Sequence, residues 1–257
     1  MGGVTARRVA IGALTGMALV VAALSLAVLR FGGAAAHEAP ADPLATVPAP
    51  AAGAPVTGAR DLDASRSATR TLVDPQWVSR LATATGIPAP AMRAYGAATL
   101  LLSRSQPGCH LGWTTLAGIG RVESGHGVGG DRSLGEDGRS STPILGPALD
   151  GSAGVAALRS TAESARWHGD LTWEHAVGPM QFLASTWERW GADGDGDGIA
   201  DPLDLDDAAY AAGRYLCADG HDLATTAGWN SAVLSYNHDP AYVLSVNAAA
   251  VAYSTRA

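Results

Sequence analysis

The sequence contains no lysine, and all 17 of its basic residues are arginine. Acidic residues number 24, which gives a formal net charge of -7, and the arginines form no basic cluster. Proteins that bind nucleic acid neutralise its phosphates with clustered basic side chains. The composition therefore excludes nucleic acid from the partners that we expect for this chain.

Cysteine is also scarce: the 257 residues contain Cys109 and Cys217 and no other cysteine. Neither lies in a motif with a base that would activate a thiol nucleophile. In an exported chain, two cysteines most simply form one disulfide. We therefore expect a bond between Cys109 and Cys217.

One long apolar run is present, at residues 9–29, and it follows Arg7 and Arg8. About twenty apolar residues are enough to span a bilayer, and preceding basic residues keep the N-terminus inside. We predict that residues 1–36 are an uncleaved signal anchor. The small residues at 34–36 leave a cleaved signal peptide as the alternative. In both cases the rest of the chain is exported, to the outer face of the cell membrane or to the wall.

Residues 37–70 are rich in alanine and proline, and this composition predicts an extended linker without a core. The remaining residues, 71–257, are enough for one domain. Several helix starts are expected in it, with Asp74, Asp206 and Asp239 as caps. Short helices and no strand long enough for a large sheet predict a mostly α domain.

A long irregular loop is expected at residues 128–171, where glycine, serine, aspartate and proline replace the helical pattern. Long loops in compact domains are usually functional or mobile. We expect this loop to form one wall of a cleft, and a disordered surface insertion is the alternative.

An acidic residue ends the apolar run that begins at Leu111. Leu116, Ile119 and Glu123 fall on one face of a helix, and the Ser-Gly-His-Gly that follows ends it. A carboxyl group on an apolar face is partly desolvated, which raises its pKa toward that of a general acid near neutral pH. The alternative is a Glu123 that points to solvent.

The stretch 177–182 contains Gly-Pro-Met-Gln-Phe, with Gln181 between two apolar side chains. An amide offers both a donor and an acceptor, which suits the N-acetyl and hydroxyl groups of a sugar. We expect Gln181 in a cleft, although glutamine is also ordinary in loops.

The stretch 193–204 has the spacing of an EF-hand loop, with glycine at position 6. Such closely spaced carboxylates repel one another without a cation, so we predict a structural Ca²⁺ site, with a solvated acidic turn as the alternative. Position 12 is an aspartate, shorter than the usual glutamate. The predicted ligands are Asp193, Asp195, Asp197, the Ile199 carbonyl, Asp201 and Asp204.

Three stretches, in this order, resemble the motifs of lytic transglycosylases: Glu-Ser-Gly-His-Gly at 123–127, Gly-Pro-Met-Gln-Phe at 178–182 and Ser-Tyr-Asn at 235–237. The sequence is most similar to the B-type membrane-bound murein transglycosylases and their actinobacterial relatives. The resemblance covers residues 72–255 and implies a lysozyme-like α domain; some members of the family carry an EF-hand-like loop.

The resemblance also implies roles for individual residues. Glu123 would be the single general acid and base, and would cleave the bond between N-acetylmuramic acid and N-acetylglucosamine in peptidoglycan with a 1,6-anhydro product. Ser124 would orient Glu123 or contact the sugar. Gln181, Tyr236 and Asn237 would line the cleft.

Two other functions remain open at this stage. A hydrolytic muramidase would need a second carboxylate, which the long loop offers at Asp131, Glu136, Asp137 or Asp150. A catalytically silent wall-binding module would use Glu123 only to hold the fold. The histidines at 126, 168 and 175 match no zinc spacing, and we expect them on the surface or in loops.

Overall fold

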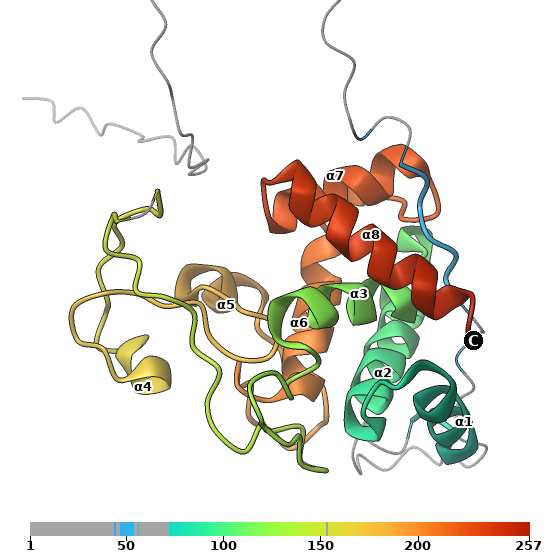
Figure 1. Ribbon diagram of the computed structural model, residues 1–257, viewed down its shortest axis with the longest axis horizontal. Coiled ribbons are helices and arrows are strands. Elements are labelled where there is room, and N and C mark those ends of the chain that lie inside the picture. Colours follow the sequence, from blue (N-terminus) through green and yellow to red (C-terminus); the bar gives the residue numbers. More distant parts are fainter. Residues whose placement is uncertain (1–43, 45–46, 54–55, 57–71, 153) are drawn as a thin grey trace, which may run out of the picture. The chain divides into compact units, whose positions relative to one another are not determined.

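The computed structural model describes residues 44, 47–53, 56, 72–152 and 154–257, whose helices are labelled in Figure 1. The predicted signal anchor at 1–36 and most of the predicted linker at 37–70 lie outside these residues. Among the described residues, no helix has the length and apolar character needed to cross a membrane.

The described part of the chain is mostly helical, and its residues outside helices pair only in isolated bridges. This confirms the prediction of a mostly α domain. The α-helices are α1 (Pro75–Thr85), α2 (Ala89–Ser105), α3 (Trp113–Ser124), α4 (Ala165–His168), α5 (Ala184–Trp190), α6 (Leu205–Leu216), α7 (Thr226–Tyr236) and α8 (Pro240–Ser254), and the short 3-10 turns are η2 (Pro107–Cys109) and η3 (Ala218–Gly220).

Side-chain caps fix the starts of several helices. Asp74 accepts a hydrogen bond from the Gln76 amide and precedes the proline that opens α1, and Asp239 caps α8 in the same way. The expected cap of α6 was wrong. Asp204, not Asp206, has the extended backbone of a cap and accepts from the Asp206 amide. Asp206 is therefore already inside the helix.

The core is built around α3, which packs against α2 and α8 (Figure 1). Leu116 and Ile119 of α3 are fully buried. Gly118 lets α8 approach closely, because a Cβ atom at this position would lie 2.8 Å from the Val246 carbonyl oxygen. The catalytic candidate Glu123 thus sits at the end of a helix whose preceding turns are buried.

A disulfide joins Cys109 to Cys217, as predicted, with 5.4 Å between the Cα atoms. It ties the turn before α3 to the end of α6. The bond closes a loop of 108 residues in the unfolded chain, and loops of this size correspond to about 4–5 kcal/mol of stabilisation in the chain-entropy description.

Part of the predicted linker contacts the helical domain. Leu44 is buried, and its carbonyl oxygen accepts a hydrogen bond from Asn230 of α7 at 2.8 Å. The Ala51 carbonyl oxygen accepts from Thr114 of α3 at 2.8 Å. These described residues pack on the domain, whereas the composition predicts a segment without buried contacts.

The chain from Gly125 to Leu183 contains only one helix among its described residues, α4, and otherwise runs in turns and bridges. Leu145 in its first half bridges to Val177 in its second half, and Arg159 bridges to Trp173 within the second half. Arg139 also bridges to Asp204 at the start of α6. The excursion is therefore folded back on itself and attached to the acidic loop.

Candidate active site

Glu123 lies in the last turn of α3. The helix ends at Gly125, whose left-handed backbone (φ 60°) directs its amide to the Arg121 and Gly120 carbonyl oxygens. The Glu123 side chain is half-buried, and the Tyr242 hydroxyl of α8 donates a hydrogen bond to its Oε1 at 2.6 Å. The carboxyl group is thus held against α8, not directed freely into solvent.

Burial raises the pKa of Glu123 to about 7, and the hydrogen bond from Tyr242 opposes this rise. Burial and the nearby Glu123 charge also raise the pKa of Tyr242, which stays a hydrogen-bond donor. Tyr242 occupies Oε1, and Oε2 has no hydrogen-bond partner among the described residues. A carboxyl group that is half-protonated near neutral pH has the property that a general acid requires.

Ser124 connects the end of α3 to the glutamine motif. Its hydroxyl donates to the Pro179 carbonyl oxygen at 2.7 Å and accepts from the Gly127 amide at 2.8 Å. The structure contains no hydrogen bond between Ser124 and Glu123. Ser124 fixes the loop that carries Gln181.

Gln181 has a left-handed backbone (φ 51°), unusual for a residue with a side chain. The side-chain Nε2 of Gln181 donates to the Gly178 carbonyl oxygen at 2.9 Å. It lines a small cavity of about 80 Å³ together with Phe182, Tyr215 and Tyr236. The structure therefore brings the two sequence motifs with Gln181 and Tyr236 to one place.

Tyr236 ends α7 and stacks on Tyr242, with ring centroids 6.5 Å apart and planes 7° from parallel. Its hydroxyl donates to the Met180 carbonyl oxygen at 2.7 Å, and Met180 is fully buried beneath it. Asn237 is exposed and accepts from the Asp239 amide at 3.2 Å, in the turn that leads into α8. Stacking on Tyr236 positions the ring whose hydroxyl reaches Glu123.

The sequence reasoning did not identify Tyr242 as a site residue. It lies 119 residues from Glu123, in a helix with no amphipathic pattern that singles it out. No local pattern links it to Glu123, because the contact joins two helices that are distant in the sequence.

His126 lies in the turn after α3, as a loop histidine would, but it is not on the surface. It is 4% exposed; one ring nitrogen, Nδ1, lies 3.1 Å from the Tyr95 hydroxyl and the other, Nε2, 2.8 Å from the Tyr253 hydroxyl. Burial and the nearby Arg121 charge lower the pKa of His126 to about 4. A neutral His126 thus links α2 to α8 directly behind the Glu123 turn.

His168 and His175 are also more enclosed than expected. They lie side by side in the excursion, with ring centroids 5.0 Å apart. The His168 Nδ1 accepts from the Asp170 amide at 3.1 Å, and burial lowers the pKa of this histidine. An imidazole whose Nδ1 accepts a hydrogen bond carries its proton on Nε2, which does not suit metal binding through that atom.

The acidic loop forms the first half of the predicted cation site. Asp193, Asp195 and Asp197 each place a carboxylate oxygen within 4.8 Å of the others, and Gly198 adopts a φ of 90°. The backbone turns inward through hydrogen bonds from the Gly198 amide to Asp193 and from the Ile199 amide to Asp197, at 2.9 and 2.7 Å. Hard oxygen donors in this arrangement fit Ca²⁺.

The other two predicted carboxylates do not join that group. Asp201 pairs with Arg139 at 2.8 Å, and Asp204 caps α6. Asp207, which the sequence reasoning did not select, accepts from the Gly194 and Asp201 amides at 2.6 and 2.9 Å. Asp207 therefore ties both ends of the acidic loop to the first turn of α6.

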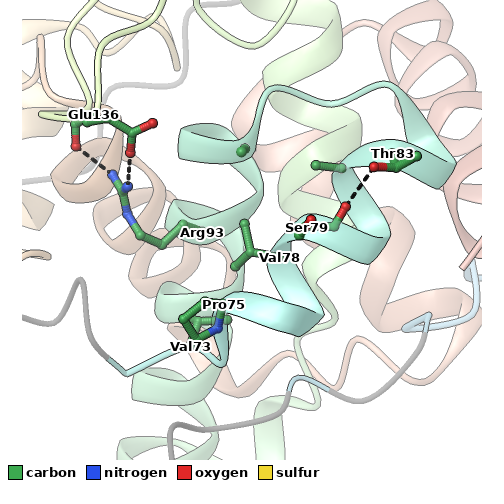
Figure 2. Close-up of a pocket in the computed structure, with 9 residues that line it drawn as sticks. Val73, Pro75, Val78, Ser79, Thr83, Arg93 and Glu136 are labelled. Atoms are coloured by element: carbon green, nitrogen blue, oxygen red, sulfur yellow. Dashed lines mark hydrogen bonds and ion pairs between the residues drawn. The ribbon is translucent and has the colours of Figure 1, made fainter.

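The carboxylates of the long loop have other contacts. Glu136 accepts from Arg93 at 3.0 Å, at the edge of a cavity of about 390 Å³ between α1 and α2 (Figure 2). Arg93 also pairs with the buried Asp206 at 3.1 Å. Asp150 accepts from the Ser152 amide, and Asp137 from the Arg139 amide. None of these carboxylates contributes to the raised pKa of Glu123.

Comparison with known proteins gives one family. Residues 157–234 match the sequence model of a family described as Transglycosylase SLT domain. Searches of curated proteins and of solved structures found no match. The matched segment contains Gln181 and the acidic loop but ends before Tyr236 and begins after Glu123. This likeness supports a lytic transglycosylase or lysozyme-like family, and with it an enzyme that cleaves glycosidic bonds of peptidoglycan.

Proposed function

We propose that this protein is a lytic transglycosylase that cleaves the β-1,4 bond between N-acetylmuramic acid and N-acetylglucosamine and leaves 1,6-anhydro ends. The observation that carries the proposal is the half-buried carboxyl group of Glu123, whose pKa is raised to about 7 and whose Oε1 is held by Tyr242. The likeness of residues 157–234 to the transglycosylase domain supplies the substrate class.

Each step of the reaction uses the same carboxyl group. Glu123 donates the proton on Oε2 to the glycosidic oxygen as the bond from C1 to that oxygen breaks. The carboxylate formed then accepts the proton of the C6 hydroxyl of the same muramic residue, while O6 bonds to C1. Glu123 ends protonated, as it began, and no water is consumed.

The surroundings of Glu123 support a mechanism with one carboxylate. Hydrolysis needs a second acidic group close to the first: about 5 Å away in retaining enzymes and 6.5–9.5 Å in inverting ones. Burial is the cause of the raised pKa of Glu123, and no other carboxylate of the described residues contributes to it. The loop carboxylate Glu136 is instead paired with Arg93.

The substrate-binding roles follow from the positions of the motifs. We propose that Gln181 and Tyr236, which share a cavity, contact the sugars beside the cleaved bond, and that the exposed Asn237 contacts the strand where it leaves the site. Ser124 acts indirectly, since its hydroxyl holds the Pro179 carbonyl oxygen.

We also propose a structural Ca²⁺ in the acidic loop, held by Asp193, Asp195, Asp197 and the Ile199 carbonyl. Asp201 and Asp204 would complete the set by leaving Arg139 and the cap of α6. The ion would rigidify the connection between the glutamine motif and α6. Export, and attachment to the membrane through residues 1–36, are proposed from the sequence pattern alone.

The proposal is tested by the release of soluble fragments from purified peptidoglycan by the full-length chain. Wild type is expected to release them, and Glu123→Gln, which keeps the size of the side chain and the acceptor for Tyr242, is expected to release none. Asp170→Asn, far along the excursion, is the control and should keep the activity. Equal release by wild type and Glu123→Gln would leave Glu123 without a catalytic role, and no release by a folded wild type would favour a wall-binding module.

A further inference from the structure

A cavity of about 550 Å³ lies outside the site described above, between α4, α5 and the acidic loop. Its volume is in the range of small-ligand sites, about 300–1,000 Å³. Its walls are lined by Glu163, Arg166, Trp167, Trp187, Glu188, Gly191, Ile199, Ala200 and Asp201.

The walls combine apolar surface with hydrogen-bonding groups. Trp167 is half-buried and Ile199 is 60% exposed, which is unusual for such a large apolar side chain in a polar loop. Glu188 is exposed and has no hydrogen bond or ion pair within the described residues. Arg166 pairs with Glu163 at 2.8 Å, but both side chains are more than 60% exposed, so a ligand can replace this contact at little cost.

These features match an N-acetylated sugar better than a charged ligand. The C–H face of a sugar packs on an aromatic ring, its hydroxyl groups donate to carboxylates, and its acetamide methyl group needs an apolar contact such as Ile199. Acidic side chains outnumber the single arginine in the lining, which disfavours an anion.

The cavity is connected to Glu123 by a continuous series of ring contacts. Trp187 packs edge-on against Phe182 at 5.3 Å, and Phe182 packs against Tyr236 at 6.0 Å. Tyr236 stacks on Tyr242, which donates to Glu123. These rings lie between the cavity wall at Trp187 and the carboxyl group, and Glu123 is not among the residues that line the cavity.

We propose that this cavity is a distal subsite that binds an N-acetylated sugar of a long glycan strand. The proposal rests on the proposed function for its ligand class. Since Ile199 and Asp201 belong to both the cavity and the acidic loop, the subsite would share a wall with the predicted cation site.

The test measures binding of uncleaved glycan to full-length chains that carry Glu123→Gln, so that it does not depend on catalysis. The ligands are glycan strands of many disaccharide units and a tetrasaccharide of two units, both without peptides. Adding Trp167→Ala is expected to lower the ratio of long-strand affinity to tetrasaccharide affinity about tenfold, the effect of losing about 1.4 kcal/mol of contact. Trp173→Ala is the matched control, because Trp173 stacks with Arg159 at 3.9 Å and does not line the cavity.

An unchanged ratio in the Trp167→Ala chain, or an equal fall in the control, would overturn the proposal. Glu188→Ala, at an exposed position, is the second variant and should lower the ratio several-fold even if Trp167→Ala impairs folding. Failure of the proposed function would be seen in a different experiment, because the wild-type chain would then cleave neither ligand. The affinity ratios, measured on chains that carry Glu123→Gln, test the subsite alone.

Discussion

Glu123 should make the folded protein less stable as the pH rises, and Glu123→Gln should remove this effect. The pKa of Glu123 is about 7 in the folded protein and about 4.5 in an unfolded chain. Between these values the folded state keeps a proton that the unfolded state has released, so raising the pH favours unfolding. The penalty is absent below pH 4.5 and complete above pH 7.

The size of the effect follows from the difference between the two pKa values. At about 1.4 kcal/mol per pKa unit, the penalty reaches roughly 3 kcal/mol above pH 7. Glu123→Gln has no charge to bury and still accepts the hydrogen bond from Tyr242. The variant should therefore match wild type near pH 4.5 and become more stable by up to roughly 3 kcal/mol near pH 8.

The assay is urea denaturation of full-length wild type and Glu123→Gln at pH 4.5, 6 and 8, with the free energy of unfolding extrapolated to water. The difference between the two proteins at each pH isolates residue 123, because the other titrating groups are common to both. A difference that does not change with pH, or a variant that is less stable than wild type at pH 8, would refute a raised pKa at Glu123.

Three other predictions concern Tyr242, His126 and the acidic loop. Tyr242→Phe removes the hydrogen bond that lowers the pKa of Glu123, so the alkaline limb of the pH–rate profile should shift to higher pH. The rate should also fall roughly tenfold. Tyr236→Phe is the control and should leave the alkaline limb at its wild-type pH. His126 should contribute less to stability as the pH falls from 6.5 toward 4, since the unfolded chain protonates it first. His126→Phe should be less stable than wild type by at least about 2 kcal/mol near pH 7, from two unpaired hydroxyls, and denaturation should show this difference shrinking toward pH 4. Chelation of Ca²⁺ should lower the melting temperature of wild type but not of Asp193→Ala, and an equal response in both would contradict the proposed site.

Helix positions could largely be predicted because their signals are local. The Asp74-Pro75 and Asp239-Pro240 pairs give both a cap and a first residue with a fixed φ, and both helices begin there. The choice between Asp204 and Asp206 was not predictable in this way. Both are aspartates near the same helix start, and only the extended backbone at Asp204 (φ -92°, ψ 126°) decides which of them caps it.

The contacts of the site could not be predicted because they join distant parts of the chain. The apolar stripe of α3 predicts a desolvated Glu123, and its half-buried position agrees. Its partner Tyr242 is 119 residues away, and the partners of His126 are 31 and 127 residues away. The glycine-rich stretch around His126 predicts a loop, but it does not predict that two distant tyrosines bury the imidazole ring.

The mass of the released fragments tests the central claim most directly. Full-length wild type is incubated with purified peptidoglycan, and the soluble products are compared with the same fragments that end in a free reducing sugar. The single-carboxylate mechanism at Glu123 predicts products lighter by one water, which contain 1,6-anhydro ends. Products with the full mass of reducing ends would contradict it, because they show that water, not the O6 of the same muramic residue, attacked C1.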